Sequence, residues 1–179
     1  MRRAMRVAGS AVAVLLVAIL VSGCSESYVT AVGPNGDATL FSDFAIGDDR
    51  RDLVRGLLTQ RIETPVRPER AFHLDLSDST GFRMRRDWRN IVFLADMGSE
   101  SWSAGICRGI LNAAAHRELV SQPAGYVFAQ DTWADGQTVL FIHAADRDAL
   151  EEMIASEGGR LIDTFHEYVI QGLQKTLYV

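Results

Sequence analysis

The sequence predicts an α+β fold in which a single mixed β-sheet of about four to five strands is packed with helices. Two kinds of segment alternate along the chain: short apolar or alternating runs typical of strands, and longer runs with apolar residues at helical spacing. Their predicted order is β-α-β-β-α-β-β-α-α. Helices that interleave with both single strands and a hairpin favour one sheet with helices packed on it.

The first half of this pattern contains three strands and a helix. Residues 38–44 and 71–76 alternate in strand fashion, and 90–97 is apolar almost throughout, which is typical of a central strand covered on both faces. Residues 48–62 place leucines, valine and isoleucine on one helical stripe, behind aspartates that favour the positive end of the helix dipole.

The second half is expected to begin with a single helix over 102–120. A hairpin follows, with arms at 125–132 and 137–144 joined by the turn Ala134-Asp135-Gly136. Two glycines cost about 2 kcal/mol inside a helix. Gly158-Gly159 therefore predicts a break, and we expect the final helices at 146–157, capped by Asp146, and at 160–177.

The N-terminus has the features of a secretory leader. Three arginines precede the eleven apolar residues 11–21, a run too short for a membrane span, which needs about 20 residues. The run ends in Val-Ser-Gly-Cys, which resembles the lipobox of bacterial lipoproteins. That resemblance implies a signal peptide over 1–23 and a lipid anchor on Cys24. Because Ser25 rather than aspartate follows, the sorting rule of that class implies the outer membrane.

The composition of residues 24–179 indicates their domain organisation and limits the kinds of partner they can bind. Residues 24–37 are small, polar and turn-forming, so they are expected to tether the lipid to a single α+β domain over 38–179. The mature chain keeps 15 basic and 23 acidic residues, a net charge of −8. An acidic chain is poorly suited to nucleic acid. With Cys24 lipidated, Cys107 has no partner in the chain, and its helical neighbours predict a buried apolar role.

Several local patterns resemble an uncharacterised lipoprotein family of Gram-negative bacteria that is catalogued as a domain of unknown function. The resemblance covers most of residues 38–150 and implies no activity. Members of that family continue into a second half with its own strands, which this chain is expected to lack. The matching positions are Thr64, Pro65, Glu69 and Phe72, the strand start Arg89-Asn90-Ile91, and the hairpin residues Asp131, Trp133, Ala134 and Gln137.

Four histidine and carboxylate positions could carry chemistry, and each also has a structural interpretation. His73 and Asp75 share a strand face, but a metal site needs a third ligand, so a solvated polar face is favoured. His143 ends an apolar strand and could be a general base, although a bond to a nearby backbone group is favoured. His166, on the last helix, is expected at the surface. We expect no cofactor and no bound metal.

The hairpin residues Asp131, Trp133 and Gln137 are the strongest candidates for a ligand or partner surface. Their structural interpretation is a turn whose side chains satisfy backbone donors, under a tryptophan folded over the sheet edge. Carboxylates beside a tryptophan are also found in glycan cleavage. Aspartates are common in turns, however, and at least two of the three tryptophans are expected in the core. The other carboxylates and tryptophans considered in this way are Asp96, Glu100, Asp135, Trp88 and Trp102.

Three functions follow from these observations. The favoured one is a non-enzymatic envelope lipoprotein that is held at the membrane through Cys24 and binds a protein partner through a sheet edge or a helical face. The second is a module that binds glycan or another small ligand through exposed tryptophans. The third is a hydrolase of unfamiliar type. The sequence has neither a nucleophile elbow nor a phosphate-binding glycine loop, so nothing in it identifies a reaction.

Overall fold

The computed structural model describes residues 38–59, 74–77, 82 and 86–177, with side chains described as far as Tyr168. The lipobox, Cys24 and His73 lie outside these residues. The strands are β1 (Ala38–Ser42), β2 (Leu74–Ser77), β3 (Asn90–Ala95), β4 (Ala124–Gln130) and β5 (Thr138–Ala144). The helices are the 3₁₀ turn η1 (Phe44–Ile46) and the α-helices α2 (Asp48–Leu58), α4 (Trp102–Ile110), α5 (Ala113–Val120) and α6 (Arg147–Leu177).

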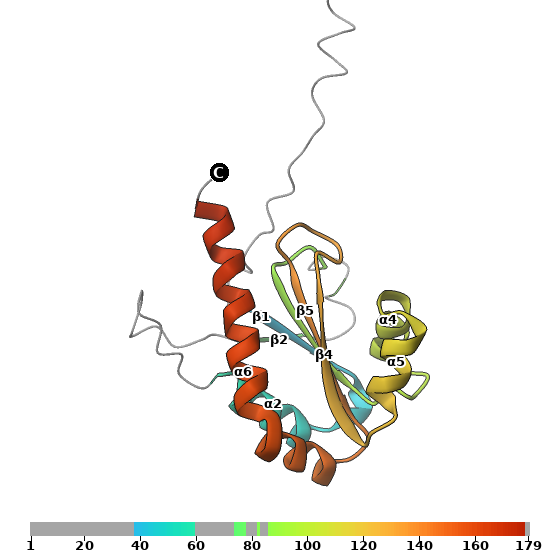
Figure 1. Ribbon diagram of the computed structural model, residues 1–179. Helices are drawn as coiled ribbons and strands as arrows, with labels where there is room; N and C mark the ends of the chain where they lie inside the picture. The colour runs from blue at the N-terminus through green and yellow to red at the C-terminus, as the bar shows by residue number, and fades with distance from the viewer. Residues whose placement is uncertain (1–37, 60–73, 78–81, 83–85, 178–179) are drawn as a thin grey trace, which may run out of the picture.

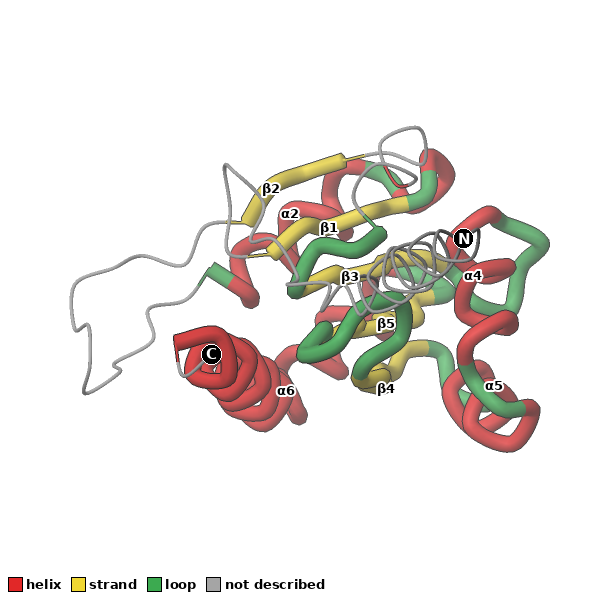
Figure 2. The backbone as a smooth tube through the Cα atoms, turned by 90° about the horizontal axis from the view of Figure 1, so that it is seen from above, coloured by secondary structure: helices red, strands yellow, loops and turns green. Residues whose placement is uncertain are grey.

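The five strands form one mixed sheet in the order β2-β1-β3-β5-β4, which confirms the predicted α+β class. Strands β2, β1, β3 and β5 run parallel, and only the outermost strand β4 runs antiparallel, as the second partner of a hairpin with β5. Figure 2 shows this order across the sheet, with β2 and β4 at opposite edges. The helices that follow β1 and β3, α2 on one side and α4 and α5 on the other, lie in connections between parallel strands, and α6 follows the last strand.

Helices cover both faces of the sheet, so the core has two halves. On one face, α2 and α6 pack on the side chains of Leu40, Leu94 and Ile142. On the other, α4 and α5 pack near Phe93 and Phe141. Figure 1 shows α6 along one side of the sheet and α4 and α5 on the other. Central strands β3 and β5 are buried along their whole length, which explains their nearly continuous apolar sequence.

The prediction of one helix over 102–120 was wrong, because the chain breaks after Ile110. Leu111 and Asn112 take extended backbone conformations, with ψ of 144° and 159°. The Asn112 side chain then accepts hydrogen bonds from the N–H groups of Ala114 and Ala115, at 3.0 and 2.9 Å. Asparagine is among the preferred N-caps, and here it starts a second helix in the middle of an otherwise helical pattern.

The predicted break at Gly158-Gly159 was also wrong, because α6 is continuous from Arg147 to Leu177. A Cβ added at Gly158 would lie 3.1 Å from Leu57 Cδ1 of α2, so the missing side chain lets the two helices approach closely. Tertiary packing thus outweighs the low helix propensity of glycine. The expectation that His166 lies at the surface was also wrong, because it is 6% exposed and faces the Leu58 backbone at the end of α2.

The remaining elements shift by a few residues from their predicted limits. Strand β1 ends at Ser42 instead of reaching residue 44, so Phe44 lies in a 3₁₀ turn. The hairpin loop spans 131–137, and Asp146 caps α6 through Ala149 N–H at 2.8 Å, as expected. Across the residues with assigned positions, none of the helices combines the length and the apolar character that crossing a membrane requires.

Candidate functional site

The carboxyl ends of the parallel strands are the first place to look for a site. In open sheets, ligands bind beyond these ends, where the connections from neighbouring strands leave in opposite directions. Here β1 leads through α2 to the β2 edge, whereas β3 leads through α4 and α5 to β4. The dividing point therefore lies between β1 and β3, next to Asp43 and Asp96, which follow these two strands.

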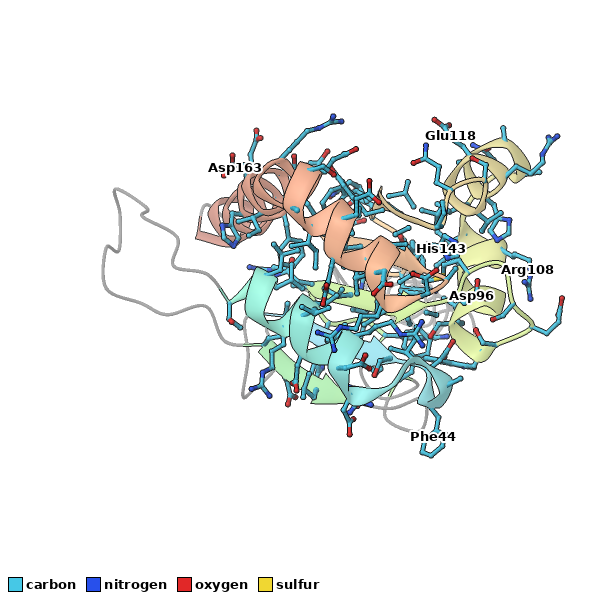
Figure 3. All side chains as sticks on the ribbon, turned by 90° about the horizontal axis from the view of Figure 1, so that it is seen from below. Phe44, Asp96, Arg108, Glu118, His143 and Asp163 are labelled. Atoms are coloured by element: carbon cyan, nitrogen blue, oxygen red, sulfur yellow. The ribbon has the colours of Figure 1, made fainter. Side chains whose placement is uncertain are left out.

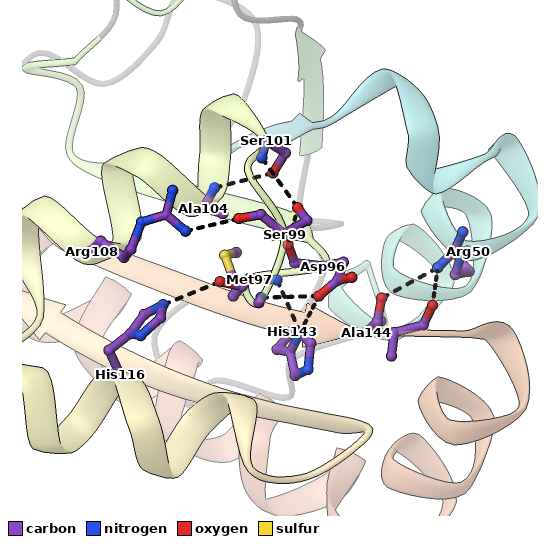
Figure 4. A network of polar contacts seen from close by, with 12 residues as sticks. Arg50, Asp96, Met97, Ser99, Ser101, Ala104, Arg108, His116, His143 and Ala144 are labelled. Atoms are coloured by element: carbon purple, nitrogen blue, oxygen red, sulfur yellow. Dashed lines mark hydrogen bonds and ion pairs between the residues drawn. The ribbon is translucent and has the colours of Figure 1, made fainter.

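A polar network holds the loop that follows β3. Met97 N–H donates to His143 Nδ1 at 3.0 Å, and Asp96 Oδ1 lies 3.6 Å from the same nitrogen. His116 Nε2, from α5, lies 3.1 Å from the Met97 carbonyl. Figure 4 shows these contacts together, and Figure 3, which views the protein from below, shows Asp96 and His143 close to each other. The network joins β3, β5 and α5 at one point.

This network determines the protonation state of His143. Because Nδ1 accepts the Met97 N–H, the proton of the neutral ring resides on Nε2. Burial lowers the pKa of His143, and the Asp96 carboxylate offsets only part of that effect. His143 is therefore a neutral acceptor for a backbone group, as the favoured interpretation of the sequence held. To act as a general base through Nδ1, it would have to release Met97.

The N-terminus of α4 is occupied by the carboxylate of Asp43. Asp43 Oδ1 accepts hydrogen bonds from Ser103 N–H at 3.2 Å and from Ser103 Oγ at 2.7 Å. Ser101 Oγ, the N-cap, accepts from Ala104 N–H at 3.3 Å. A helix N-terminus attracts anions. Here the carboxylate of Asp43 occupies the position that an anion would take, and it connects the end of β1 to the start of α4.

Beside this connection lies a groove of about 810 Å³ at the carboxyl ends of β1 and β2, which we call the Phe44 groove. The Phe44 side chain is fully exposed, and Leu76 is 39% exposed. Among the described residues, these are the two large apolar side chains that are exposed. Figure 3 shows Phe44 projecting away from the body of the protein. The other lining residues are Ser42, Asp43, Ala45, Arg51, Ser77, Ser101 and Trp102.

The polar residues of the Phe44 groove are largely engaged with each other. Arg51 Nε donates to Ser42 Oγ at 2.9 Å, and its guanidinium lies 2.9 Å from Asp48 Oδ1. The ring of Trp102 packs against the core rings of Phe82 and Phe93, with centroids 5.2 and 5.7 Å away. What the groove offers to a partner is therefore mainly apolar surface at its rim.

The predicted site residues of the hairpin lie at the other end of β5, outside the Phe44 groove. Gln137 is fully buried. Its Oε1 accepts from Trp133 N–H at 3.0 Å, and its Nε2 donates to the carbonyls of Arg86 and Trp88 at 2.7 and 2.6 Å. Asp131, at a φ of 51°, accepts from Gly136 N–H at 2.6 Å. Both side chains thus satisfy backbone groups of the loop.

Two of the three tryptophans contribute to the aromatic core, as expected. Trp133 packs edge-on against Phe82 at 5.1 Å and lies 6.4 Å from Phe93, and Trp102 joins the same cluster. Trp88 is half-buried. A ring that packs on core phenylalanines has little free face for a sugar, so the structure does not bring the tryptophans together as a stacking platform.

The other candidates do not form a reactive centre within the described part of the chain. Asp96 accepts from Gly98 N–H at 3.0 Å, and Glu100 pairs with Arg108 at 3.3 Å. Cys107 is fully buried, and burial raises the pKa of its thiol to about 11, so it is an inert core residue, as expected. Among the described residues, no three histidine, cysteine or carboxylate side chains are grouped as metal ligands would be.

Two residues of this region were missed in the sequence. Arg50 donates to the carbonyls of Ile46 at 2.6 Å and of Ala144 and Ala145 at 3.2 Å, so it ties α2 to the end of β5. No local pattern indicates a partner 94 residues away. Phe44 was assigned to a strand because it continues an alternating pattern. Only the end of β1 at Ser42 turns it outward.

These features define an α+β domain with helices on both faces of a mainly parallel sheet, and with its strand ends closed by internal polar contacts. The chain belongs to the family described as Domain of unknown function (DUF8532), whose model matches residues 41–178. This agrees with the expected membership of an uncharacterised family. Neither the curated proteins nor the solved structures contain a match to this chain.

Proposed function

We propose that this protein is a non-enzymatic lipoprotein of the cell envelope, anchored through Cys24, whose domain binds a protein partner. The proposed location is the outer membrane. Partner binding is carried by one observation, the fully exposed Phe44 at the rim of the Phe44 groove. Contiguous exposed apolar surface with a polar border typically marks a protein interaction site. The acidic charge of the mature chain argues against nucleic acid as the partner.

The anchor is supported by the arginine-rich start, the short apolar run and Val-Ser-Gly-Cys ending at Cys24. Stable attachment needs more than one acyl chain, which the multiply acylated cysteine of lipoproteins supplies. Cells labelled with radioactive palmitate should yield a labelled wild-type protein and an unlabelled Cys24→Ala variant. A labelled variant would refute the anchor. Ser25→Asp should move the protein toward the inner membrane in hosts that use that sorting rule.

The absence of catalysis is proposed from how the strand ends are used. His143, Asp43 and Asp96 are titratable groups near the position where an open sheet holds its ligand. His143 and Asp43 each accept a hydrogen bond from the backbone of a neighbouring loop or helix, and Asp96 accepts one from Gly98 in its own loop. A catalytic carboxylate or imidazole must be available to the reacting group. The imidazole of His143 and the Oδ1 atom of Asp43 instead hold neighbouring segments of the chain in place.

A photoreactive phenylalanine analogue at position 44 tests partner binding in intact cells. We expect a discrete crosslinked adduct that depends on the groove, so a second substitution, Leu76→Asp, should abolish it. The same analogue at Asp163, on the exposed side of α6, serves as the control and should give no such adduct. Equal adducts from both positions, or an adduct that survives Leu76→Asp, would contradict a specific partner at the Phe44 groove.

The alternative is a small ligand, such as a glycan, in the same groove. It is favoured by Trp102, which lines the groove together with Arg51 and three serines. Binding of soluble envelope glycan fragments should then quench tryptophan fluorescence, and a Trp102→Phe variant should lose the quenching. Quenching without any protein adduct at position 44 would favour this alternative over the partner.

A further inference from the structure

The outer edge of β4 has unpaired backbone groups. Strands β4 and β5 pair one-to-one from Ala124 to Gln130, and the bonds Ala145 N–H to Pro123 O and Asp131 N–H to Gln137 O flank the ladder. Since hydrogen-bonded and non-bonded pairs alternate in an antiparallel ladder, odd-numbered residues of β4 bond to β5. Even-numbered residues, such as Tyr126 and Phe128, then direct their N–H and C=O groups outward. In the described chain, no strand pairs there.

This edge lacks the features that usually protect an edge strand. Natural sheets protect their edges with charged side chains, prolines, bulges or very short strands. Strand β4 has the sequence AGYVFAQ, seven residues with no charge and no proline, and its register with β5 contains no bulge. A long apolar edge of this kind is a template for another strand. A partner segment paired with β4 would form hydrogen bonds with its outward-facing N–H and C=O groups.

The surroundings of the edge form a groove that fits a single extended chain. A groove of about 600 Å³ lies over the first half of β4, with α5 as one wall and α6 as the other. Figure 1 shows β4 between these two helices. The charged residues of its walls are Glu118 from α5 and Glu152, Glu157 and Arg160 from α6, three carboxylates against one guanidinium. The walls therefore complement basic side chains.

We propose that the outer edge of β4 binds an extended, basic segment of a partner protein, which adds a sixth strand to the sheet. Strand addition obtains affinity from main-chain hydrogen bonds and specificity from the pockets that receive alternate side chains. Alternate side chains of the added strand would face α5 and α6 in turn, so arginines or lysines at either parity reach a carboxylate. The inference extends the proposed partner binding to a second surface, separate from the Phe44 groove.

A second copy of this chain fits the edge less well. If two β4 edges paired about a two-fold axis, the helical walls of one copy would meet those of the other. The carboxylates of Glu118, Glu152 and Glu157 would then face their own counterparts, and like charges across an interface are unfavourable. A basic strand without flanking helices avoids both the contact between helical walls and the repulsion between carboxylates.

Peptide titration tests the proposal with a defined probe. The full lipidated chain, in detergent micelles, is titrated with a blocked octapeptide of alternating arginine and valine that carries a fluorophore. We expect saturable binding, and binding at least tenfold weaker for the same peptide with glutamate in place of arginine. The triple variant Glu118→Lys/Glu152→Lys/Glu157→Lys, which reverses the charge of both walls, should weaken binding of the arginine peptide at least tenfold, whereas Asp163→Lys, an exposed charge reversal on α6, should leave it within twofold.

Amide hydrogen exchange separates strand addition from simple charge attraction. In the free chain, the amides of Val127 and Ala129 should exchange slowly because they bond to β5, and those of Tyr126 and Phe128 should exchange fast. The arginine peptide should slow Tyr126 and Phe128 at least tenfold. Binding without this alternating protection would overturn the proposal, as would equal affinity for both peptides or a β4-paired dimer in sedimentation.

These outcomes are independent of the proposed function. A Phe44 adduct in cells together with failed peptide binding would refute only the β4 inference. The reverse pair of results would refute only the Phe44 groove as a partner site.

Discussion

Replacing Gln137 by methionine would remove a buried amide while keeping almost the same volume. The amide makes three hydrogen bonds: it accepts from Trp133 N–H at 3.0 Å and donates to the carbonyls of Arg86 and Trp88 at 2.7 and 2.6 Å. It thereby ties the hairpin loop to the segment that leads into β3. Methionine fills the space with an apolar chain and makes none of these bonds.

The expected cost follows from the number of bonds. An intramolecular hydrogen bond contributes about 1 kcal/mol net, and a buried donor or acceptor that is left unsatisfied can cost more. Because Gln137 is fully buried and volume is retained, the loss should be about 3 kcal/mol, nearly all from hydrogen bonding. That is a large part of the roughly 5–15 kcal/mol that stabilises a domain. At about 2–4 °C per kcal/mol, Tm should fall by about 6–12 °C.

Guanidinium and thermal unfolding of residues 25–179, with and without the substitution, provide the measurement. The slope of free energy against denaturant should not change, since the surface exposed on unfolding is the same. Gln130→Met is the matched control, because Gln130 is exposed and accepts a single bond from Thr138 Oγ at 3.3 Å. If Gln137→Met costs less than about 1 kcal/mol, or no more than the control, the buried amide does not hold the loop.

Three further measurements test the packing and the electrostatics. Burial lowers the pKa of His143 and of His166 in the folded chain. Below about pH 6.5 the unfolded chain therefore binds more protons than the folded chain. The unfolding free energy should fall between about pH 7.5 and pH 5.5, by at most about 1.4 kcal/mol per histidine per pH unit. Equal denaturation midpoints at the two pH values would contradict this. Gly159→Ala should stabilise the fold by about 0.5–1 kcal/mol, since nothing lies within 4 Å of its added Cβ. Gly158→Ala should stabilise it less, because the added Cβ would contact α2. Equal stabilisation by both substitutions would refute the close packing of α6 on α2. Trp133→Ala should cost about 3 kcal/mol, and a Tm within a degree or two of wild type would instead favour an exposed ligand platform.

The agreement between sequence and structure is best where a residue's environment is local. The alternating or continuous apolar runs located all five strands, because a strand buried on one or both faces leaves a period-two or unbroken pattern. Capping chemistry at Asp146 was also readable, since the acceptor and its donor are three residues apart. The buried state of Cys107 followed from its helical neighbours.

The candidate sites were less predictable because their contacts span the chain. The sequence favoured a structural role in the turn for Asp131 and Gln137, and both side chains bond to backbone groups. The sequence did not indicate which groups the Gln137 amide binds, because the carbonyls of residues 86 and 88 are about fifty positions away. The groove that exposes Phe44 depends on where β1 ends and on its neighbour β2. No residue near Phe44 in sequence reveals either fact.

By itself, the sequence determined the leader-like N-terminus, the alternation of strands and helices, and the acidic charge, because each is a property of neighbouring residues. Only the tertiary structure decided that Gly158 lies inside a continuous helix, since the compensation comes from Leu57 of another helix. It alone also decided which strand is outermost. Periodicity records how deeply a segment is buried, whereas strand order depends on the crossovers, and these placed β4, with its unpaired edge, between α5 and α6.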